Sequence, residues 1–162
     1  MRAPFNVLVI AFHRAPDAET LYCVLRRADA GFWQWVAGGG EDQETPVEAA
    51  RRETREETGI EGQLYALQSQ ARVPVTSFAA RKDWPDDLYV IPEYHFAVEA
   101  PAPEARLSAE HTACEWLPYD AAFARLHWQS NQTARRAHPP PPYPRAQVGG
   151  GPQNPPRGNK GG

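Results

Sequence analysis

Three glutamates stand close together near the end of one predicted helix. Glu53 and Glu57 are four residues apart and Glu53 and Glu56 three apart, so a helix places all three on one face. Carboxylates crowded on one face repel each other, and the carboxyl end of a helix disfavours them further. A hard divalent cation with oxygen ligands would relieve that repulsion; Mg²⁺ usually takes one or two carboxylates plus substrate phosphates. The spacing therefore predicts a metal site.

The helix that carries these glutamates has a recognisable start and stop. Thr45 can cap the first turn, Pro46 suits the first helical position, and Glu48 can complete a capping box with Thr45. Gly59 is a natural left-handed stop after the last turn. These signals predict a helix over Pro46–Thr58.

A charged helix turned towards solvent is the alternative interpretation. Arg51, Arg52 and Arg55 are interleaved with the acids, and runs of charge are usually solvated faces. The composition of the helix alone does not decide between these interpretations; what argues against the solvated helix is that the longer stretch from Gly38 to Ile60 resembles a known family motif.

Gly38, five residues, Glu44, seven residues and then Arg52–Ile60 (RETREETGI) resemble the Nudix box, G-x5-E-x7-R-E-U-x-E-E-x-G-U. Thr54 stands where the family usually has a bulkier aliphatic residue, and Gln43 where a glycine often precedes the first box glutamate. Neither departure removes a ligand. The resemblance implies an α/β fold of the Nudix type, an α/β/α sandwich with a mixed sheet and a loop–helix–loop catalytic motif.

The other segments fit a mixed sheet with helices packed on it. Gly38–Gly40 are expected to give a tight backbone path whose N–H groups face an anion, and Pro74–Asp87 reads as an exposed loop. Residues 1–137 are predicted to form one domain, and residues 138–162, with eight prolines and six glycines, a disordered tail. The predicted strands are Phe5–Phe12, Leu21–Arg26 (paired with the first), Gln63–Val73, Leu88–Glu99 and Thr112–Leu117, and the further predicted helices are Tyr119–Leu126 and Asn131–Ala137.

Composition narrows the class of protein. The chain has 162 residues, and its net charge of −3 comes from mixed acids and bases, which indicates neither a general nucleic-acid binder nor a membrane-surface binder. Cys23 and Cys114 lie in apolar runs, where buried free thiols are expected rather than a disulfide or a metal pair. The apolar run near the N-terminus is too short to span a bilayer. We expect a cytoplasmic enzyme; the sequence leaves its oligomeric state undecided.

Three segments outside the box extend the resemblance. They are Arg26–Gln34 (RRADAGFWQ), Glu110 with Cys114–Leu117 (CEWL), and His127–Gln132 (HWQSNQ). Together they resemble the Nudix subfamily of dihydroneopterin triphosphate pyrophosphohydrolases, also known as dATP pyrophosphohydrolases, over roughly residues 5–137. The loop that follows Val73, where substrate choice is expected to lie, follows no pattern of this kind.

This resemblance implies the metal ligands. Glu53 and Glu57 would be the principal ligands of Mg²⁺, or of Mn²⁺ in its place, with Glu56 close by. Glu110 would be an extra acid from outside the box that binds metal or activates water. Gly38 would supply backbone near the metal.

The resemblance also implies supporting roles. Arg52 would orient Glu56 or Glu57 rather than touch substrate, and Glu44 would fix the loop before the helix. Either Glu56 or Glu110 would be the base for an in-line attack of water on a triphosphate, which releases pyrophosphate and a monophosphate.

Residues before the box are candidates for substrate binding. Phe32 and Trp33 could stack on a flat pterin or purine, and Gln34 could bond its edge, although aromatic residues beside strands are mostly core. Arg26 and Arg27 could clamp phosphates.

The predicted function is hydrolysis of a small nucleoside or pterin triphosphate. A dinucleoside polyphosphate hydrolase and a housecleaning enzyme for oxidised nucleotides are alternatives with the same chemistry. A Nudix-fold binding module is an alternative of another class, with the proline-rich tail recruiting a partner. The clustered glutamates argue against it, because a protein that only binds does not need their repulsion.

Overall fold

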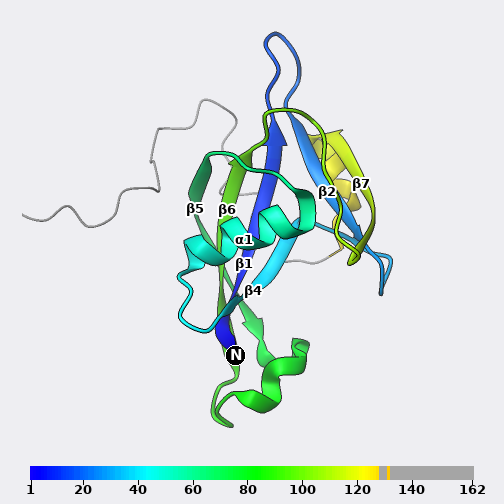
Figure 1. Ribbon diagram of the computed structural model, residues 1–162. Coiled ribbons are helices and arrows are strands. Elements are labelled where there is room, and N and C mark those ends of the chain that lie inside the picture. Colours follow the sequence, from blue (N-terminus) through cyan, green and yellow to red (C-terminus); the bar gives the residue numbers. More distant parts are fainter. Residues whose placement is uncertain (128–130, 132–162) are drawn as a thin grey trace, which may run out of the picture.

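The computed structural model describes residues 1–127 and residue 131. One mixed sheet of seven strands forms its centre (Figure 1). The strands are β1 (Arg2–His13), β2 (Leu21–Arg27), β3 (Trp33–Gln34), β4 (Val36–Glu41), β5 (Leu64–Pro74), β6 (Val90–Glu99) and β7 (His111–Pro118); the helices are α1 (Pro46–Thr58) and α2 (Tyr119–Arg125), with 3-10 turns η1 (Val75–Ser77) and η2 (Ala79–Asp83).

The first strand, β1, is the axis of the sheet. It runs parallel to β6 along one side, from Asn6 opposite Glu93 to Phe12 opposite Glu99. Along its other side it pairs first with β4 and only at its end with β2, both antiparallel. The predicted pairing of β1 with β2 is therefore confined to Phe12 and His13, and β2 pairs mainly with β7. Figure 1 shows β2 leaving β1 below the hairpin that joins them, while β4 lies beside the lower part of β1.

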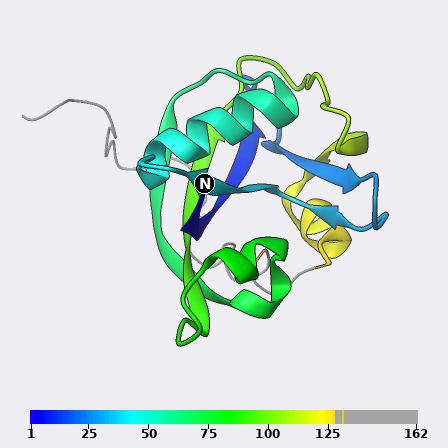
Figure 2. The ribbon, with the colours of Figure 1, turned by 60° about the horizontal axis from the view of Figure 1, so that its bottom comes forward.

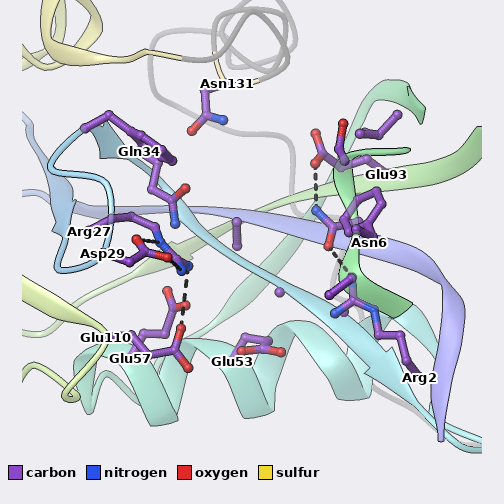
Figure 3. Close-up of a pocket in the computed structure, with 18 residues that line it drawn as sticks. Arg2, Asn6, Arg27, Asp29, Gln34, Glu53, Glu57, Glu93, Glu110 and Asn131 are labelled. Carbon is purple, nitrogen blue, oxygen red and sulfur yellow. Dashed lines mark hydrogen bonds and ion pairs between the residues drawn. The ribbon is translucent and has the colours of Figure 1, made fainter. Parts of the chain in front are cut away.

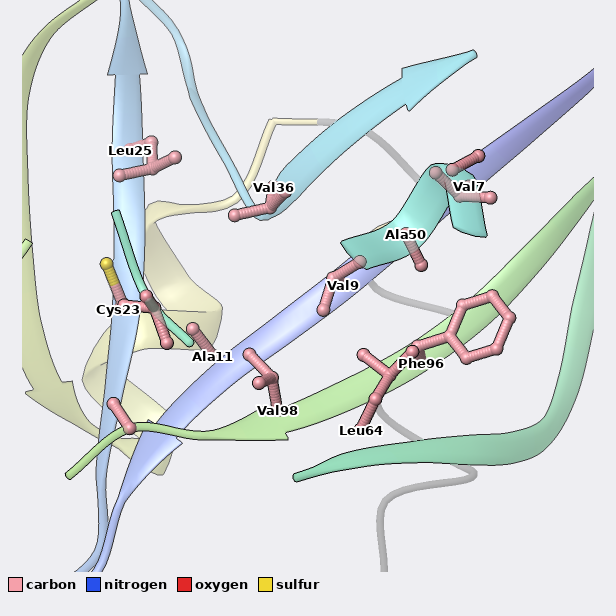
Figure 4. Close-up of a cluster of buried hydrophobic side chains, with 13 residues drawn as sticks. Val7, Val9, Ala11, Cys23, Leu25, Val36, Ala50, Leu64, Phe96 and Val98 are labelled. Carbon is pink, nitrogen blue, oxygen red and sulfur yellow. The ribbon is translucent and has the colours of Figure 1, made fainter. Parts of the chain in front are cut away.

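Alternation along β1 divides the core into two layers, because successive side chains of a strand point to opposite faces. Val7, Val9 and Ala11 pack beneath α1, in the cluster of Figure 4. Leu8 and Ile10 pack in the other cluster, which contains Ala122 of α2. The expected α/β/α sandwich with a mixed sheet is confirmed.

Helix α1 has the predicted bounds and the predicted caps. The Thr45 side chain accepts from the Glu48 N–H, the Glu48 side chain accepts from the Thr45 N–H at 2.8 Å, and Pro46 opens the helix. Gly59 adopts φ 68° and donates its N–H to the Arg55 carbonyl. Figure 2 shows α1 lying across one face of the sheet.

The structure refines two expectations about segments without predicted secondary structure. Gly38–Gly40 belong to β4, and Gly38 and Gly39 pair with β1, so the tight backbone path expected there is an extended strand. They are small because side chains fill the space above them: a Cβ on Gly40 would lie 2.0 Å from the Phe5 ring. The segment Pro74–Asp87 is not simply exposed, since it forms η1 and η2 and buries the indole of Trp84, whose Nε1 donates to the Arg2 carbonyl at 3.0 Å.

The remaining predicted strands match β5, β6 and β7 within one or two residues at each end, and α2 lies over the predicted Tyr119–Leu126. Apart from Asn131, the predicted helix Asn131–Ala137 and the predicted tail at 138–162 lie outside the described residues. Cys23 and Cys114 are free thiols 3.0 Å apart at their Sγ atoms. No helix among residues 1–127 is long and apolar enough to cross a membrane.

Candidate active site

A cavity of about 480 Å³ opens beside the inner face of α1 (Figure 3). Its lining comes from α1, from the first part of β1, from β4, from the end of β2 and from the η1 region, segments that are far apart in the sequence. Charged and polar side chains are prominent around it, with acids and guanidinium groups both present: Arg2, Asn6, Arg27, Asp29, Gln34, Glu53, Glu57, Glu93, Glu110 and Asn131.

Glu53 and Glu57 are the two box glutamates that line this cavity. Glu57 is only 4% exposed, and its Oε2 has no hydrogen-bond partner among the described residues. Burial, and then the neighbouring charge of Glu53, raise the pKa of Glu57 to about 9. Burial also raises the pKa of Glu53. A buried carboxylate and a half-buried one on adjacent helical turns favour a bound cation beside them.

The backbone beside these carboxylates makes room for them. A Cβ on Gly38 would lie 2.0 Å from the carboxyl carbon of Glu53, so only glycine lets Glu53 occupy this place. With the unpartnered oxygen of Glu57, this cradle fits a hard divalent cation. Among the described residues, however, no three carboxylate, imidazole or thiol groups converge on one point. The protein would therefore supply few ligands, leaving positions for phosphate and water.

Arg52 connects the loop before α1 to the glutamates. Its guanidinium donates to both carboxylate oxygens of Glu44, at 2.8 and 3.0 Å, and to the Gly39 carbonyl at 2.7 Å. It also donates to Glu53 at 2.9 Å and to Glu56 at 3.1 Å. The same contacts raise the pKa of Arg52, Glu44 being the largest cause. Arg52 thus orients Glu53 and Glu56; among the described residues its hydrogen bonds do not include one to Glu57.

Glu44 holds the entry to α1 as expected. Besides its paired bonds with Arg52, it accepts from the Glu41 N–H at 2.9 Å. The bond from Arg52 lowers the pKa of Glu44. The loop is therefore braced against the helix that carries the carboxylates.

The two remaining candidate acids are less enclosed. Glu56 has a side chain that is 58% exposed, bonds to Arg52 and does not line the cavity. Glu110 lines the cavity, and its carboxylate lies 3.5 Å from the guanidinium of Arg27. The structure thus brings Glu110, but not Glu56, to the cavity wall beside Glu53 and Glu57. Their roles as metal ligand or base stay predictions.

The two candidate arginines are neighbours on β2, but only one of them lines the cavity. Arg27 lines the cavity and is held by Asp29 through two bonds, at 2.7 and 2.9 Å (Figure 3). Arg26 is exposed, and its Nε donates to the Gly31 carbonyl instead. The structure therefore brings only Arg27 of this pair to the cavity.

The candidate aromatic residues are separated in the same way. Phe32 and Gln34 line the cavity, and Phe32 stacks on His127 with ring centroids 5.0 Å apart. Trp33 packs against the core around α2, with the Arg125 guanidinium 5.3 Å above its ring. Trp33 is thus a packing residue in this structure.

Several cavity residues were not anticipated from the sequence. Arg2, Asn6 and Glu93 lie at the β1 and β6 side of the cavity. His111 is not part of the cavity lining but lies behind Glu57: it is buried at the start of β7, with its Nε2 4.0 Å from Glu57 Oε2 and neither ring nitrogen bonded to another described residue. Burial lowers the pKa of His111, which favours its neutral form. The β1 and β6 side of the cavity had one signal in the sequence, since Asn6 is a polar residue inside the apolar strand FNVLVIAF.

Comparison with known proteins identifies the family. Residues 4–138 match the family model described as the NUDIX domain. This chain belongs to the Nudix family. The match covers the sheet from residue 4 onward, both helices and every site residue predicted from the sequence, and it confirms the resemblance inferred from the box. Nudix hydrolases generally use divalent metal ions, in agreement with the buried carboxylates described above.

Individual relatives agree with the Nudix assignment. The dihydroneopterin triphosphate diphosphatase of Escherichia coli is 31% identical over 137 residues, 82% of this chain and 90% of that protein. A crystal structure from Listeria monocytogenes described as a NUDIX hydrolase has a TM-score of 0.73 and 39% identity, covering 83% of this chain and 91% of that one. These names agree with the expectation of an enzyme.

Two other relatives show the breadth of the Nudix similarity. The asymmetrical bis(5'-nucleosyl)-tetraphosphatase of Rattus norvegicus is 35% identical over 122 residues, 72% of this chain and 79% of that protein. The octanoyltransferase of Myxococcus xanthus is 39% identical over 127 residues, 76% of this chain but only 33% of that protein. This chain thus spans about a third of the Myxococcus protein.

Proposed function

We propose that this Nudix protein is a Mg²⁺-dependent pyrophosphohydrolase that cleaves a pterin or nucleoside triphosphate to pyrophosphate and a monophosphate. The observation that carries the proposal is the pair of half-buried Glu53 and buried Glu57, both with raised pKa values, in a cavity that guanidinium groups also line. Buried acids beside cations in one cavity suit a polyanionic substrate that arrives with a divalent cation.

The chain's own residues would divide the work. Glu53 and Glu57 would hold Mg²⁺, and Arg27, held in place by Asp29, would face the phosphate oxygens. When bound, Mg²⁺ would neutralise phosphate charge and activate a water molecule. Glu110 would be the candidate base, since it lies at the cavity wall whereas Glu56 does not. Phe32, backed by His127, would offer a ring face to the pterin or base.

The E. coli diphosphatase supports a pterin triphosphate as substrate, since it matches this chain over most of both lengths. The rat tetraphosphatase supports a second candidate, asymmetric cleavage of a dinucleoside tetraphosphate. The two differ in their products: pyrophosphate with a monophosphate in the first case, two nucleotides in the second.

A substrate panel in Mg²⁺ tests the proposal. It contains dihydroneopterin triphosphate, the four dNTPs, oxidised dGTP, diadenosine tetraphosphate and ADP-ribose, with products separated by chromatography. Pyrophosphate released chiefly from dihydroneopterin triphosphate or from the unmodified dNTPs is the expected result. Preference for the dinucleotide would replace the first candidate by the second, and preference for oxidised dGTP would indicate the housecleaning alternative. Binding of Mg²⁺ and nucleotide without turnover of any compound would indicate a binding module.

A further inference from the structure

A buried carboxylate on β6 lines the cavity and has no place in the metal chemistry above. Glu93 is 4% exposed. Its Oε2 accepts from the side-chain amide of Asn6 at 2.8 Å, and its Oε1 lies 3.2 Å from His95 Nε2. Figure 3 shows Glu93 beside Asn6, across the cavity from the carboxylates that rise from α1.

The partners of Glu93 are themselves held. His95 has a fully buried side chain, and its Nδ1 lies 2.8 Å from the Ser69 hydroxyl. A neutral ring satisfies both contacts when Nε2 carries the hydrogen, donates to Glu93, and Nδ1 accepts from Ser69. On the other side of Glu93, the Arg2 guanidinium donates to the side-chain oxygen of Asn6, Oδ1, at 3.0 Å. Because that bond fixes the side-chain amide, the Asn6 NH₂ group points at Glu93. The carboxylate is therefore fixed in one orientation from both sides.

Glu93 retains unused acceptor capacity. A carboxylate offers about four lone-pair sites, and the contacts with Asn6 and His95 use two of them. Among the described residues no arginine or lysine forms an ion pair with Glu93; its one charged-type contact is to His95. A buried acceptor that leaves sites open towards a cavity suits a ligand that brings N–H donors.

The open acceptor sites of Glu93 favour a ligand ring with two N–H donors side by side. In guanine and in pterin, a ring N–H stands next to an exocyclic amino group, so two donors can meet one carboxylate side by side. Hypoxanthine keeps the ring N–H but lacks the amino group. Adenine presents a ring acceptor next to its amino group, and an acceptor facing a buried carboxylate is repelled.

We propose that Glu93 determines specificity by accepting the paired N–H donors of a 2-amino-4-oxo ring, of guanine or pterin type. This inference rests on the proposed function, and it deepens that function by selecting one class of ring. The carboxylates of α1 hold the phosphate end of the substrate, and Glu93 holds the ring. His95 is a positioning residue, because it lies outside the cavity lining and contacts Glu93; Asn6 also positions Glu93, although it lines the cavity itself.

The test compares dGTP with dITP, which differ only in the 2-amino group, and includes dATP. kcat/KM is measured in Mg²⁺ for the wild type, for Glu93→Gln and for Glu99→Gln. The last variant is the control, since it makes the same change on the same strand at a residue that pairs with Arg14 away from the cavity. Folding of each variant is checked by circular dichroism.

The wild type and Glu99→Gln should prefer dGTP over dITP by about tenfold or more, and dATP should be the poorest of the three. Glu93→Gln should reduce the dGTP preference to about threefold or less, because the amide offers one acceptor oxygen and places a donor against the ring donors. Equal wild-type values for dGTP and dITP would overturn the proposal, as would an unchanged preference in a folded Glu93→Gln. If that variant does not fold, the wild-type ratio decides.

Failure of the proposed function is distinguishable from failure of this inference. If the wild type hydrolyses no triphosphate, its affinities for dGMP and dIMP are measured by calorimetry. Tighter binding of dGMP would keep the role of Glu93 while the hydrolase proposal falls, and equal affinities would reject both. Turnover of all three triphosphates at equal rates would keep the hydrolase proposal and reject the role of Glu93.

Discussion

The carboxylate of Glu53 lies directly over Gly38, so closely that a Cβ there would fall 2.0 Å from its carboxyl carbon. Gly38 is held in β4 by pairing with Val7 of β1, so the backbone cannot easily retreat. The strand and the helix are thus fitted to one another at the position where a cation is expected, and the consequences can be measured.

Gly38→Ala should displace the Glu53 carboxylate and lower kcat/KM by about a hundredfold, since a shift of about 1 Å in such a site is enough for that. Gly40→Ala is the matched control on the same strand: its new Cβ would meet the Phe5 ring and should lower stability, leaving the activity of the folded fraction unchanged. Steady-state kinetics and thermal melting separate the two. Equal loss of activity in both variants would contradict the account.

The pH dependence of stability should report the raised pKa of Glu57. The folded-state pKa of about 9 lies above the ordinary glutamate pKa of 4.5, so between these pH values the folded state keeps a proton that the unfolded state has lost. The contribution of Glu57 to stability is therefore fully present below pH 4.5 and is lost as pH rises through 9. The slope is at most about 1.4 kcal/mol per pH unit.

Thermal melting of metal-free protein from pH 5 to 9 checks this prediction. The melting temperature of the wild type should fall as the pH rises, and that of Glu57→Gln should fall less. Adding Mg²⁺ at high pH should raise the melting temperature of the wild type but not that of Glu57→Gln. If the melting temperatures of the two proteins changed in parallel with pH and Mg²⁺ had no effect, the pKa of Glu57 would not be raised in the folded state.

Arg52→Lys should lower activity more than stability. Lysine cannot form the paired bond to Glu44 while also reaching Gly39 and Glu53, so the carboxylates lose their support. We expect roughly a 10- to 100-fold loss in kcat/KM and a weaker apparent affinity for Mg²⁺. Arg55→Lys, an exposed change on the same helix, is the control, and similar losses in both variants would refute an orienting role for Arg52.

The adjacent aromatic residues should give opposite results. Phe32→Leu should raise KM roughly three- to tenfold and leave the melting temperature little changed, because Phe32 lines the cavity. Trp33→Leu should lower the melting temperature and leave KM unchanged, because Trp33 packs with Arg125 against the α2 core. The reverse pattern would mean that Trp33 contacts the substrate.

Local signals were sufficient for helix α1. Its capping box, its opening proline and its closing glycine all act within the segment itself, so the predicted Pro46–Thr58 agrees with the structure. The spacing of Glu53 and Glu57 predicted that they share one face of that helix, and both line the cavity, while their role as metal ligands stays a prediction. Strand glycines such as Gly38 could not be interpreted locally, since the reason for their size is a side chain from a distant element.

Which of the candidate substrate-binding residues face the cavity could in principle be predicted from strand geometry. Successive residues of a strand point to opposite faces, so Trp33 and Gln34 of β3 cannot both face one cavity. Asn6 and Glu93 face each other only because β1 and β6 pair in parallel, a contact between residues 87 positions apart that no local pattern contains.

The most direct measurement is Mg²⁺-dependent pyrophosphate release from dihydroneopterin triphosphate by the wild type and by Glu57→Gln. The account predicts pyrophosphate and monophosphate in equal amounts from the wild type. It predicts a rate at least about a hundredfold lower from Glu57→Gln with its fold retained, because a neutral amide cannot hold the cation as the carboxylate does. Near-normal turnover by a folded Glu57→Gln would contradict the central claim.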